Sequence, residues 1–353
     1  MVKEPIYQMP AEWEKHGATQ LHWPFNRETW PGDSLARVEE VYLEIIYQLH
    51  RFEPIILLCD HKIKVDQIKT RMVSRGIDLK RIRLYSIPIN DVWARDCGPV
   101  FVKKITPQNT EYIITDWEYN AWSGKYPPYN ADNAIPEWFS KTFDIPSVKT
   151  GRVLEGGSID TNGSGTFLTT ESVLLNPNRN PELSKEKIEQ LLHHYLGAEN
   201  IIWLKNGLAG DDTDGHIDDL ARFVNKNTIV TMVTDDHDDI NYDTLQENLD
   251  ILNQATDKDG NPFHIIELPM PITHTEIPTI DGSHYLPASY ANFYIANGTV
   301  LIPLYDKLYD SEILDLFCHL FPNREITGIQ CSDLVWGQGS IHCITQQLYN
   351  ISV

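Results

Sequence analysis

The chain has 353 residues, a formal net charge of −21 and five cysteines, and it is long enough to bury a substantial core. The acidic balance argues against nucleic acid or an anionic membrane surface as a partner, because such binding relies on basic patches. A cationic ligand would be attracted, although acidity also serves solubility alone.

The cysteines are odd in number, scattered and without a Cys-x-x-Cys pair, which argues against a disulfide framework and a cysteine zinc site. The first residues, MVKEPI, include no apolar signal region, and no apolar run approaches the roughly 20 residues of a membrane helix. We therefore expect a cytoplasmic protein. No linker rich in Pro, Gly and Ser divides the chain, which predicts a single domain over residues 1–353.

Helix and strand patterns alternate along the chain. Apolar residues at three- and four-residue steps predict a helix over 34–50, followed by a buried strand over 55–59. Further helices are expected over 61–74, 184–196, 242–254 and 309–321, and strands over 83–88, 201–204, 228–233 and 290–303. The last strand segment contains Asn297-Gly298, which predicts a hairpin. Five helices would divide the strands into about five groups, a rhythm compatible with repeated α/β units.

The segment GSIHCITQQ, residues 339–347, contains a candidate nucleophile, Cys343. If residues 341–345 are extended, His342 and Cys343 point to opposite faces, so His342 is a poor base for this thiol. The alternative interpretation of Cys343 is a small buried apolar residue. Gly337 and Gly339 would allow a ligand to approach the backbone closely.

The segment GDDTDGHIDD, residues 210–219, concentrates acids around a histidine. An EF-hand calcium loop is excluded, because its first and twelfth ligands would be Gly210 and Ala221. His216 and Asp218 are two positions apart, so an extended backbone would direct both into one pocket, as an acid/base with an anionic neighbour. A solvated acidic loop is the competing interpretation for the remaining acids, Asp211, Asp214 and Asp219.

Two further segments carry carboxylates. In NDVWARDCGPVFV, residues 90–102, we expect Asp91 and Arg95 to form a structural salt bridge, and Trp93 to belong to the core or to a pocket wall. In LEGGSID, residues 154–160, Glu155 precedes two glycines that allow a ligand to approach. A free thiol, a histidine and several carboxylates suit a cationic substrate, because two aspartates can hold a planar guanidinium.

These segments together resemble the agmatine deiminase family, which is related to the bacterial peptidylarginine deiminases and belongs to the guanidine-modifying pentein superfamily. The matching stretches run through most of the chain, at residues 9–24, 91–99, 154–181, 214–219, 289–306 and 337–347. The resemblance implies an α/β fold, a five-bladed, pseudo-fivefold propeller of ββαβ units with the site in its central channel.

The resemblance also implies roles for individual residues. Cys343 would be the nucleophile, His216 the general acid/base, Asp96 and Asp218 the guanidinium clamps, and Glu155 an additional site carboxylate. Trp93 would line the pocket, and Asp212 would lie near the amino end of the substrate. The cationic guanidine is itself the electrophile, so neither a metal nor a cofactor is expected.

The implied reaction is the hydrolysis of agmatine to N-carbamoylputrescine and ammonia through a thiouronium on the cysteine. Deimination of peptidylarginine or another arginine derivative, amidino transfer, and non-catalytic binding of a guanidinium or polyamine are the alternatives. The sequence leaves homo-oligomerisation open. It departs from the family pattern at Gln338, which interrupts a frequent triple glycine, and in WPFNRETWPG at 23–32, which concerns substrate choice.

Overall fold

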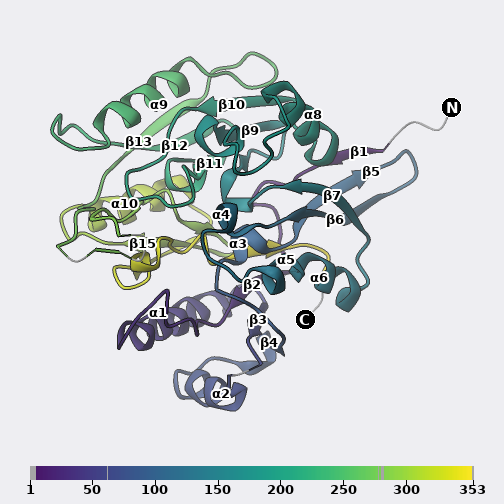
Figure 1. Ribbon diagram of the computed structural model, residues 1–353, viewed down its shortest axis with the longest axis vertical. Helices are drawn as coiled ribbons and strands as arrows, with labels where there is room; N and C mark the ends of the chain where they lie inside the picture. Colours follow the sequence, from purple (N-terminus) through teal and green to yellow (C-terminus); the bar gives the residue numbers. More distant parts are fainter. Residues whose placement is uncertain (1–4, 62, 277, 280–281, 352–353) are drawn as a thin grey trace.

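The computed structural model describes residues 5–61, 63–276, 278–279 and 282–351, whose strands form five separate sheets (Figure 1). Each sheet contains the same connection: two antiparallel strands, then a helix, then a strand parallel to the second. A parallel pair needs such a crossover, because both strands run in one direction. The fold is therefore a mixed α/β fold built from repeated units of one topology.

Four of these sheets follow one another along the chain. Their orders are β1 (Ile6–Gln8), β5 (Val100–Ile105), β6 (Thr110–Glu118), β7 (Ser147–Val153); β10 (Asn200–Leu204), β9 (Thr166–Thr170), β8 (Asp160–Thr161); β11 (Ala221–Asn225), β12 (Thr228–Val233), β13 (His264–Pro269); and β14 (Tyr294–Ile295), β15 (Thr299–Leu304), β16 (Glu325–Gln330). Their crossover helices are α6 (Ile135–Phe143), α8 (Lys185–Leu196), α9 (Tyr242–Gln254) and α10 (Asp310–Leu320).

The fifth sheet joins the two ends of the chain. It has the order β17 (Gln346–Leu348), β2 (Ala18–His22), β3 (Ile55–Cys59) and β4 (Ile82–Ser86). β17 pairs with β2 in antiparallel register, with Gln346 opposite Gln20. The helices α1 (Ser34–Leu49) and α2 (Val65–Ser74) connect β2 to β3 and β3 to β4. This closure brings the segment that contains Cys343 next to the N-terminal strands.

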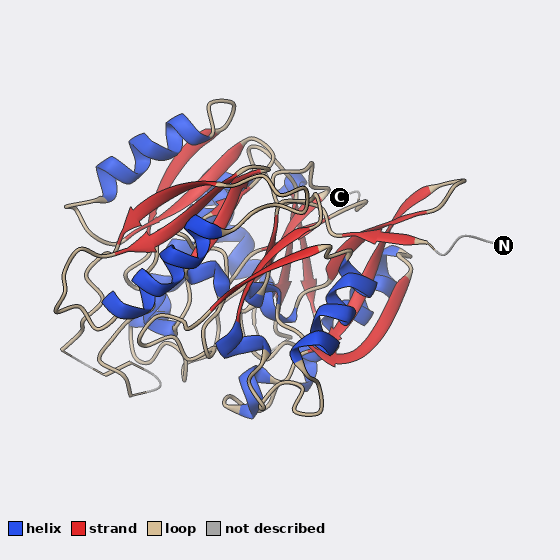
Figure 2. Cartoon of the chain, turned by 90° about the horizontal axis from the view of Figure 1, so that it is seen from above, coloured by secondary structure: helices blue, strands red, loops and turns tan. Residues whose placement is uncertain are grey.

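Short helical turns complete the chain and carry several site residues. They are η1 (Leu79–Arg81), α3 (Ala94–Cys97), α4 (Ala121–Gly124), α5 (Asn130–Asn133), η2 (Gly156–Ser158), α7 (Glu171–Leu174), η3 (Ile217–Asp219) and η4 (Val335–Gly337). Figure 1 shows α1, α2, α8 and α9 toward the outside and α3 near the middle, and Figure 2 shows helices and strands spread around the molecule instead of one continuous sheet.

The long predicted elements are confirmed within a few residues. Ser184 occupies the N-cap position of α8, and Gly197 ends this helix with a φ of 77°, as its sequence indicates. β14 and β15 form the predicted hairpin around Asn297-Gly298. The predicted helix over 61–74 begins only at Val65, and residue 62 lies outside the described residues.

The five predicted helices do not each belong to a different sheet, as the sequence pattern suggested. α1 and α2 both belong to the sheet that joins the chain ends. The crossover helix of the sheet that contains β5, β6 and β7 is α6, which the periodicity did not predict. α6 has only nine residues, with Pro136 in its first turn, so it offers too few turns for a clear helical pattern.

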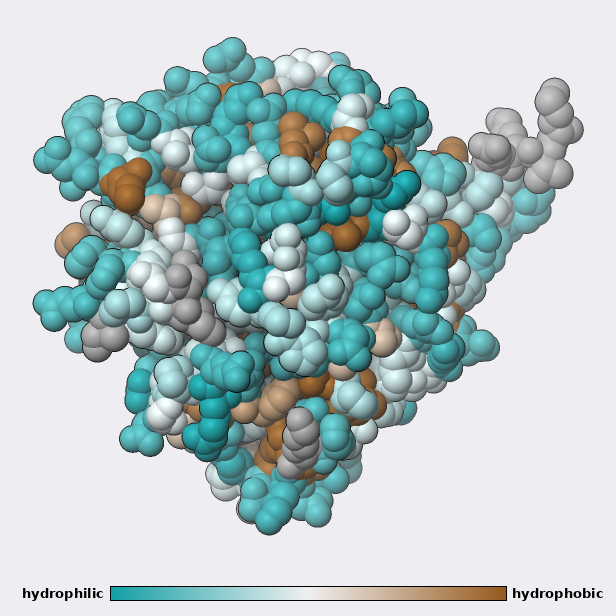
Figure 3. Space-filling model, in the orientation of Figure 1, coloured by the Kyte–Doolittle hydropathy of each residue, from teal (hydrophilic) through white to brown (hydrophobic). Residues whose placement is uncertain are grey.

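The interior is apolar and the surface mostly hydrophilic. The largest buried cluster includes Trp23, Trp30, Trp93 and Cys343, so the candidate nucleophile lies at the edge of a packed core. Figure 3 shows a hydrophilic face with small, separate apolar patches. Among the described residues, no helix combines the length and the apolar character needed to cross a bilayer.

Candidate active site

Cys343 lies in a turn, not in a strand. Residues 341–344 are turn residues, and β17 begins only at Gln346, so the expectation of an extended 341–345 segment is wrong. The amide of Thr345 donates to the carbonyl of His342 at 3.1 Å, which closes this turn. Gly339 allows the tight packing here, because a Cβ atom at this position would lie 2.4 Å from the Trp93 ring and 3.1 Å from the Cys343 Cβ.

The thiol of Cys343 contacts an amide and a carboxylate. Its Sγ atom lies 3.2 Å from Nδ2 of Asn292 and 3.9 Å from Oδ2 of Asp218. Asn292 also donates through Nδ2 to Oδ1 of Asp219 at 2.9 Å, and its Oδ1 accepts from the amide of His342 at 2.9 Å. Asn292 therefore fixes the turn that carries the nucleophile.

Asp96 is presented by the short helix α3. Its Oδ1 accepts from the amide of Gly157 at 3.0 Å, and its Oδ2 accepts from Nε1 of Trp122 at 3.2 Å. The side chain is 5 % exposed and lies on the wall of a cavity that also reaches Cys343. This carboxylate is thus oriented by two donors and still accessible to a ligand.

His216 and Asp218 come from the turn into η3. Nδ1 of His216 lies 3.7 Å from Oδ1 of Asp96 and 4.0 Å from Oδ1 of Asp218. The amide of His216 donates to Oδ2 of Asp211 at 2.9 Å, which anchors the loop. Among the described residues, Nε2 of His216 and Oδ1 of Asp218 are buried without a hydrogen-bond partner. Such atoms are costly unless a ligand or water satisfies them.

Glu155 is fully buried and forms an ion pair with an arginine. Its Oε1 accepts from Nε of Arg179 at 2.6 Å, whereas its Oε2 has no partner among the described residues. Arg179 also binds Oδ2 of Asp214 at 2.7 Å. Sequence reasoning missed Arg179, although its segment, NRNP at 178–181, is one of the stretches that match the family.

Gly157 lies where three of these side chains converge. A Cβ atom at this position would lie 2.6 Å from Nδ1 of His216, 2.8 Å from Oδ1 of Asp96 and 3.2 Å from Oδ2 of Asp218. Only a residue without a side chain fits there. The two glycines after Glu155 are therefore needed for close packing among the site residues themselves.

Burial and mutual repulsion set the charge states of the site. Burial, with the carboxylates of Asp218 and Asp219, raises the pKa of the Cys343 thiol well above its ordinary value. Burial likewise raises the pKa of Asp96 to about 7, and the attraction of His216 opposes this only in part. Cys343 is consequently a thiol at neutral pH when no ligand is bound.

His216 and Asp218 shift in the directions that favour their charged forms. Burial alone would lower the pKa of His216, but the carboxylates of Asp96 and Asp218 outweigh it, and the pKa is raised. Burial alone would raise the pKa of Asp218, but the hydrogen bond and the charge of His342 outweigh it, and the pKa is lowered. The site thus holds an anionic Asp218 and a histidine that readily takes a proton.

The cavity has a volume of about 670 Å³ and brings together Cys343, Asp96, Trp93 and Asp212. His216, Asp218 and Glu155 are buried, and the first two converge with Asp96 on Gly157. At the other end, the hydroxyl of Tyr126 donates to Oδ2 of Asp212. Further lining residues are Phe25, Asn26, Arg27, Glu28, Thr29, Asp91, Tyr119, Trp122, Tyr129, Asp132, Gly337 and Gln338. The segment WPFNRETWPG therefore faces the ligand space.

Gln338 lines this cavity in an unusual conformation. Its φ of 74° and ψ of 22° fall in the left-handed region, which favours glycine. The family's frequent glycine at this point has a physical reason, and here a glutamine adopts the same backbone conformation.

The expected salt bridge between Asp91 and Arg95 is wrong. Asp91 and Arg95 do not pair: Asp91 accepts from Asn26 and Thr29 at 2.9 and 2.7 Å. Arg95 instead donates to Oε1 of Gln347 at 2.7 Å and pairs with Glu12. The two side chains bind different partners, so four positions of separation in sequence do not imply contact.

The solvated-loop interpretation of the remaining acids also fails in part. Asp219 is buried and bonded to Asn292, and Asp214 pairs with Lys125 and Arg179.

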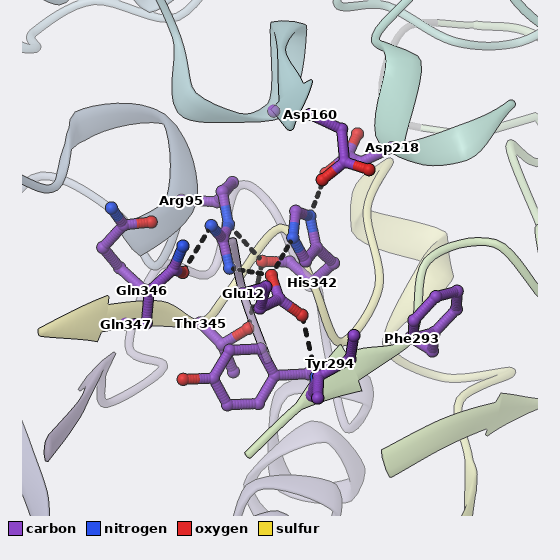
Figure 4. Close-up of polar contacts among 12 residues, drawn as sticks. Glu12, Arg95, Asp160, Asp218, Phe293, Tyr294, His342, Thr345, Gln346 and Gln347 are labelled. Atoms are coloured by element: carbon purple, nitrogen blue, oxygen red, sulfur yellow. Dashed lines mark hydrogen bonds and ion pairs between the residues drawn. The ribbon is translucent and has the colours of Figure 1, made fainter. Parts of the chain in front are cut away.

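A buried ionic network supports the site and was missed by sequence reasoning (Figure 4). His342 lies between Asp218 and Glu12, and Glu12 also pairs with Arg95 and Arg222. A signal existed for Glu12, because it lies inside the family-like segment at residues 9–24. Nothing local in the sequence indicates which partners it meets.

Two groups of described residues have the side-chain types of metal ligands in proximity. His22, Cys97 and Asp132 form one, but Asp132 accepts from the amides of Asn90 and Asp91 at 2.7 and 3.0 Å. The other consists of Asp218, Asp219 and Cys343, whose contacts are those described above. The second group thus consists of candidate active-site residues.

Comparison with known proteins identifies the class to which this arrangement belongs. The family model of the Porphyromonas-type peptidyl-arginine deiminases matches residues 8–348. A Legionella pneumophila protein named "Putative agmatine deiminase" is 38% identical over 346 residues, covering 98% of this chain and 96% of that protein. Its counterpart from Mycoplasma capricolum is 35% identical over 361 residues, with coverages of 98% and 96%.

Solved structures superimpose on this chain over nearly its whole length. Agmatine deiminase of Enterococcus faecalis, described as catalysing its reaction, superimposes with a TM-score of 0.86 at 32% identity, covering 99% of this chain and 98% of that chain. A substrate-bound variant of the agmatine deiminase of C. jejuni gives 0.86 at 30% identity, with coverages of 100% and 99%.

The named relatives are hydrolases that act on carbon–nitrogen bonds of linear amidines, and this chain shares their fold throughout. The chain belongs to the family of Porphyromonas-type peptidyl-arginine deiminases, within the guanidine-modifying enzymes.

Proposed function

We propose that the protein hydrolyses a cationic guanidine, and that agmatine is the preferred substrate, giving N-carbamoylputrescine and ammonia. The observation that carries the proposal is the position of the Cys343 thiol, 3.9 Å from a buried carboxylate, Asp218. A carboxylate beside a nucleophilic thiol opposes its ionisation, unless a cation occupies the same space. The electrostatics therefore favour a cationic electrophile over a neutral amide or ester.

A bound guanidinium would be held by carboxylates and attacked by sulfur. Its nitrogens can donate to Asp96, to the unpartnered Oδ1 of Asp218 and to the unpartnered Oε2 of Glu155. The positive charge lowers the cost of ionising Cys343, whose proton passes to solvent as the cation enters. The thiolate then adds to the guanidino carbon.

His216 serves both halves of the reaction. As an imidazolium it gives a proton to the departing nitrogen, ammonia leaves, and an S-alkylthiouronium remains on Cys343. The neutral imidazole then takes a proton from water, whose oxygen adds to the same carbon. Collapse of this adduct breaks the carbon–sulfur bond and releases the ureido product, and a proton returns to the sulfur.

The far end of the cavity supports a diamine-like substrate. Asp212, held by Tyr126, and the ring of Trp93 line the space beyond Cys343, and such a carboxylate suits the primary amine of agmatine. We expect Asp212→Asn to raise KM for agmatine with a smaller effect on kcat, because the amine is bound remotely from the reacting carbon. The names of the enterococcal and C. jejuni relatives point to the same substrate.

An arginine derivative is the second candidate, and Arg27 is the observation that favours it. This exposed residue lines the cavity, where it could pair with the carboxylate of arginine or a peptide. The family description also names peptidyl-arginine. Arg27→Ala should lower kcat/KM for arginine derivatives but not for agmatine if this alternative holds.

The decisive assay measures ammonia release from agmatine, free arginine, a peptidylarginine and methylated arginines. We expect agmatine to give the highest kcat/KM, and Cys343→Ala to release no ammonia while keeping its fold by circular dichroism. A covalent adduct on Cys343, trapped by acid and seen by mass spectrometry, separates an enzyme from a non-catalytic binder of guanidinium or polyamine. Full turnover by Cys343→Ala would refute the nucleophile.

The five sheets are also the basis of a proposal about symmetry. Their shared topology suits five blades arranged around a pseudo-fivefold axis, with Asp96, His216 and Cys343 contributed from different blade connections. An experimental structure with an internal fivefold superposition of the blades tests this arrangement.

A further inference from the structure

His342 precedes the nucleophile, yet it contacts a different site residue. Its Nδ1 lies 2.6 Å from Oδ2 of Asp218, and its Nε2 lies 2.8 Å from Oε2 of Glu12 (Figure 4). The side chains of all three residues are nearly or fully buried. The imidazole is therefore a bridge between two carboxylates, one of which touches Cys343.

The hydrogen-bond donors and acceptors of these groups determine which atoms carry a proton. An ionised carboxylate only accepts, and a neutral imidazole has a single N–H donor. Two contacts of this length, each to an ionised carboxylate, need an N–H donor at each of the two ring nitrogens. Attraction and hydrogen bonding outweigh burial and lower the pKa of both Glu12 and Asp218, so both are ionised and both ring nitrogens carry hydrogen.

The wider network balances this charge. Glu12 pairs with Arg222 at 3.0 Å and with Arg95 at 3.2 Å, and Arg222 pairs with Asp160 at 3.3 Å. With His342 as an imidazolium, the network contains three cations and three carboxylates. With a neutral His342 it would contain one uncompensated buried negative charge, which is costly.

One oxygen of Asp218 is occupied and the other is free. Oδ2 is taken by His342, whereas Oδ1 has no partner among the described residues and lies 4.0 Å from His216. The bond to His342 thus fixes the rotation of the carboxylate so that its open oxygen points toward the site.

We propose that His342 is a positioning residue, an imidazolium that Glu12 anchors and that holds the Asp218 carboxylate oriented for the guanidinium. The role rests on the proposed function insofar as the ligand is a guanidine. It assigns to the histidine beside the nucleophile a task other than proton transfer to or from the substrate.

Several charged groups face this pair and must be considered in any pH dependence. They are Glu12 before β2, Arg95 and Asp96 on α3, Asp160 on β8, His216 and Asp219 at η3, Arg222 on β11 and the thiol of Cys343. Among the described residues, His342 and the thiol of Cys343 donate to Oδ2 of Asp218, at 2.6 and 3.9 Å, so the bond from His342 is much the shorter. Removal of His342 should therefore affect Asp218 first.

The first test reads the proton directly and needs no activity. The wild-type protein is labelled with ¹⁵N-histidine, and the His342 ring nitrogens are assigned by comparison with His342→Gln. We expect both ring nitrogens to carry hydrogen at pH 7. A single-N–H tautomer at pH 7 would overturn the proposal, whatever the substrate.

The second test measures agmatine binding by calorimetry in a Cys343→Ala background, with and without His342→Gln. Without the imidazolium, Asp218 should hold a proton at low pH, because an opposite charge at this distance shifts a carboxyl by about 1–3 pKa units. At pH 6 we expect the variant with His342→Gln to bind agmatine about tenfold more weakly than its parent and to release an additional fraction of a proton, from Asp218, on binding. The difference in affinity between the two proteins should shrink toward pH 9. His50→Gln, which removes a buried imidazole at the end of α1 bonded to the carbonyl of Tyr47 at 2.7 Å, should match the parent.

The outcomes separate the two proposals. Unchanged affinity, or the same weakening at every pH, would show that His342 has a packing role only. If His342→Gln does not fold, the ¹⁵N measurement on the wild-type protein still decides. Absence of ammonia release from every guanidine by the wild-type protein would overturn the proposed function, and it would leave the protonation of His342 as a separate result.

Discussion

Oδ2 of Asp218 lies 3.9 Å from Sγ of Cys343 and 2.6 Å from Nδ1 of His342. One carboxylate oxygen therefore touches both the nucleophile and the residue before it in sequence. The contact with Asp218 raises the pKa of the Cys343 thiol, whereas the hydrogen bond and charge of His342 lower the pKa of Asp218. Under the proposed function, we expect such a site to be poorly reactive until a cation enters it.

The first prediction concerns the reactivity of Cys343. Because burial and carboxylates raise its pKa well above the ordinary value, the free protein should be alkylated slowly by iodoacetamide at pH 7, and faster as pH rises above 9. The measurement is the rate of modification of Cys343, followed by mass spectrometry of its peptide. The exposed Cys318 provides the internal reference. Alkylation of Cys343 at pH 7 as fast as that of Cys318 would contradict the prediction.

The second prediction concerns Asp96, whose pKa is raised to about 7 by burial. Between about pH 4 and pH 7 the folded protein holds a proton that the unfolded chain has lost, so this group reduces stability as pH rises through that window. Asp96→Asn removes the buried charge. We expect the variant to lose turnover, yet to melt about 2 °C or more above the wild type at pH 8, with the difference shrinking toward pH 4. Thermal unfolding at several pH values tests this, and a variant less stable at pH 8 would contradict it.

The third prediction concerns Asp218, whose pKa is shifted in the direction opposite to that of Asp96. The hydrogen bond and charge of His342 outweigh burial and lower its pKa, so Asp218→Asn leaves His342 charged without its partner. Breaking a buried pair costs about 3 kcal/mol, and we expect that loss in urea unfolding at pH 8. The double variant Asp218→Asn/His342→Gln should recover part of it. Equal stability of Asp218→Asn and wild type would show that the pair contributes nothing.

The fourth prediction concerns Gly157. Gly157→Ala places a Cβ 2.6 Å from His216 and 2.8 Å from Asp96, so these side chains must move. A displacement of about 1 Å in positioned groups can cost about 100-fold in rate. We expect kcat/KM for agmatine to fall by that order. Gly328→Ala in β16 is the matched control, because its Cβ would meet the flexible side chain of Leu304 at the end of β15. Equal activities of the two variants would argue against the convergence at Gly157.

Local sequence was sufficient for the long elements but not for the short ones. α1, α8, α9 and α10 have enough turns to show a helical period, and the Asn297-Gly298 turn is encoded in two residues. α6 is too short for such a signal. The turn at 341–344 resembles a strand in its apolar residues, because a buried turn and a buried strand have similar composition.

The sequence predicted those residues of the candidate site that lie in short local motifs. Cys343, Asp96, Asp212 and Trp93 line one cavity, His216 and Asp218 converge with Asp96 on Gly157, and Glu155 is buried. Short motifs contain these residues, so pattern and family resemblance could select them. Asn292 and Arg179 lie in family-like segments too, but their side-chain partners are distant in sequence, and no local pattern identifies them.

The sequence by itself determined the alternation of strands and helices, the acidic character of the chain and the set of chemical groups available for a cationic substrate. Only the tertiary structure decided which of these groups meet. His342 and Asp218 are 124 positions apart, and they touch because β17 pairs with β2 and closes the chain. Protonation also depends on this closure, since a pKa responds to burial and to charges within a few ångströms, whatever their distance along the chain.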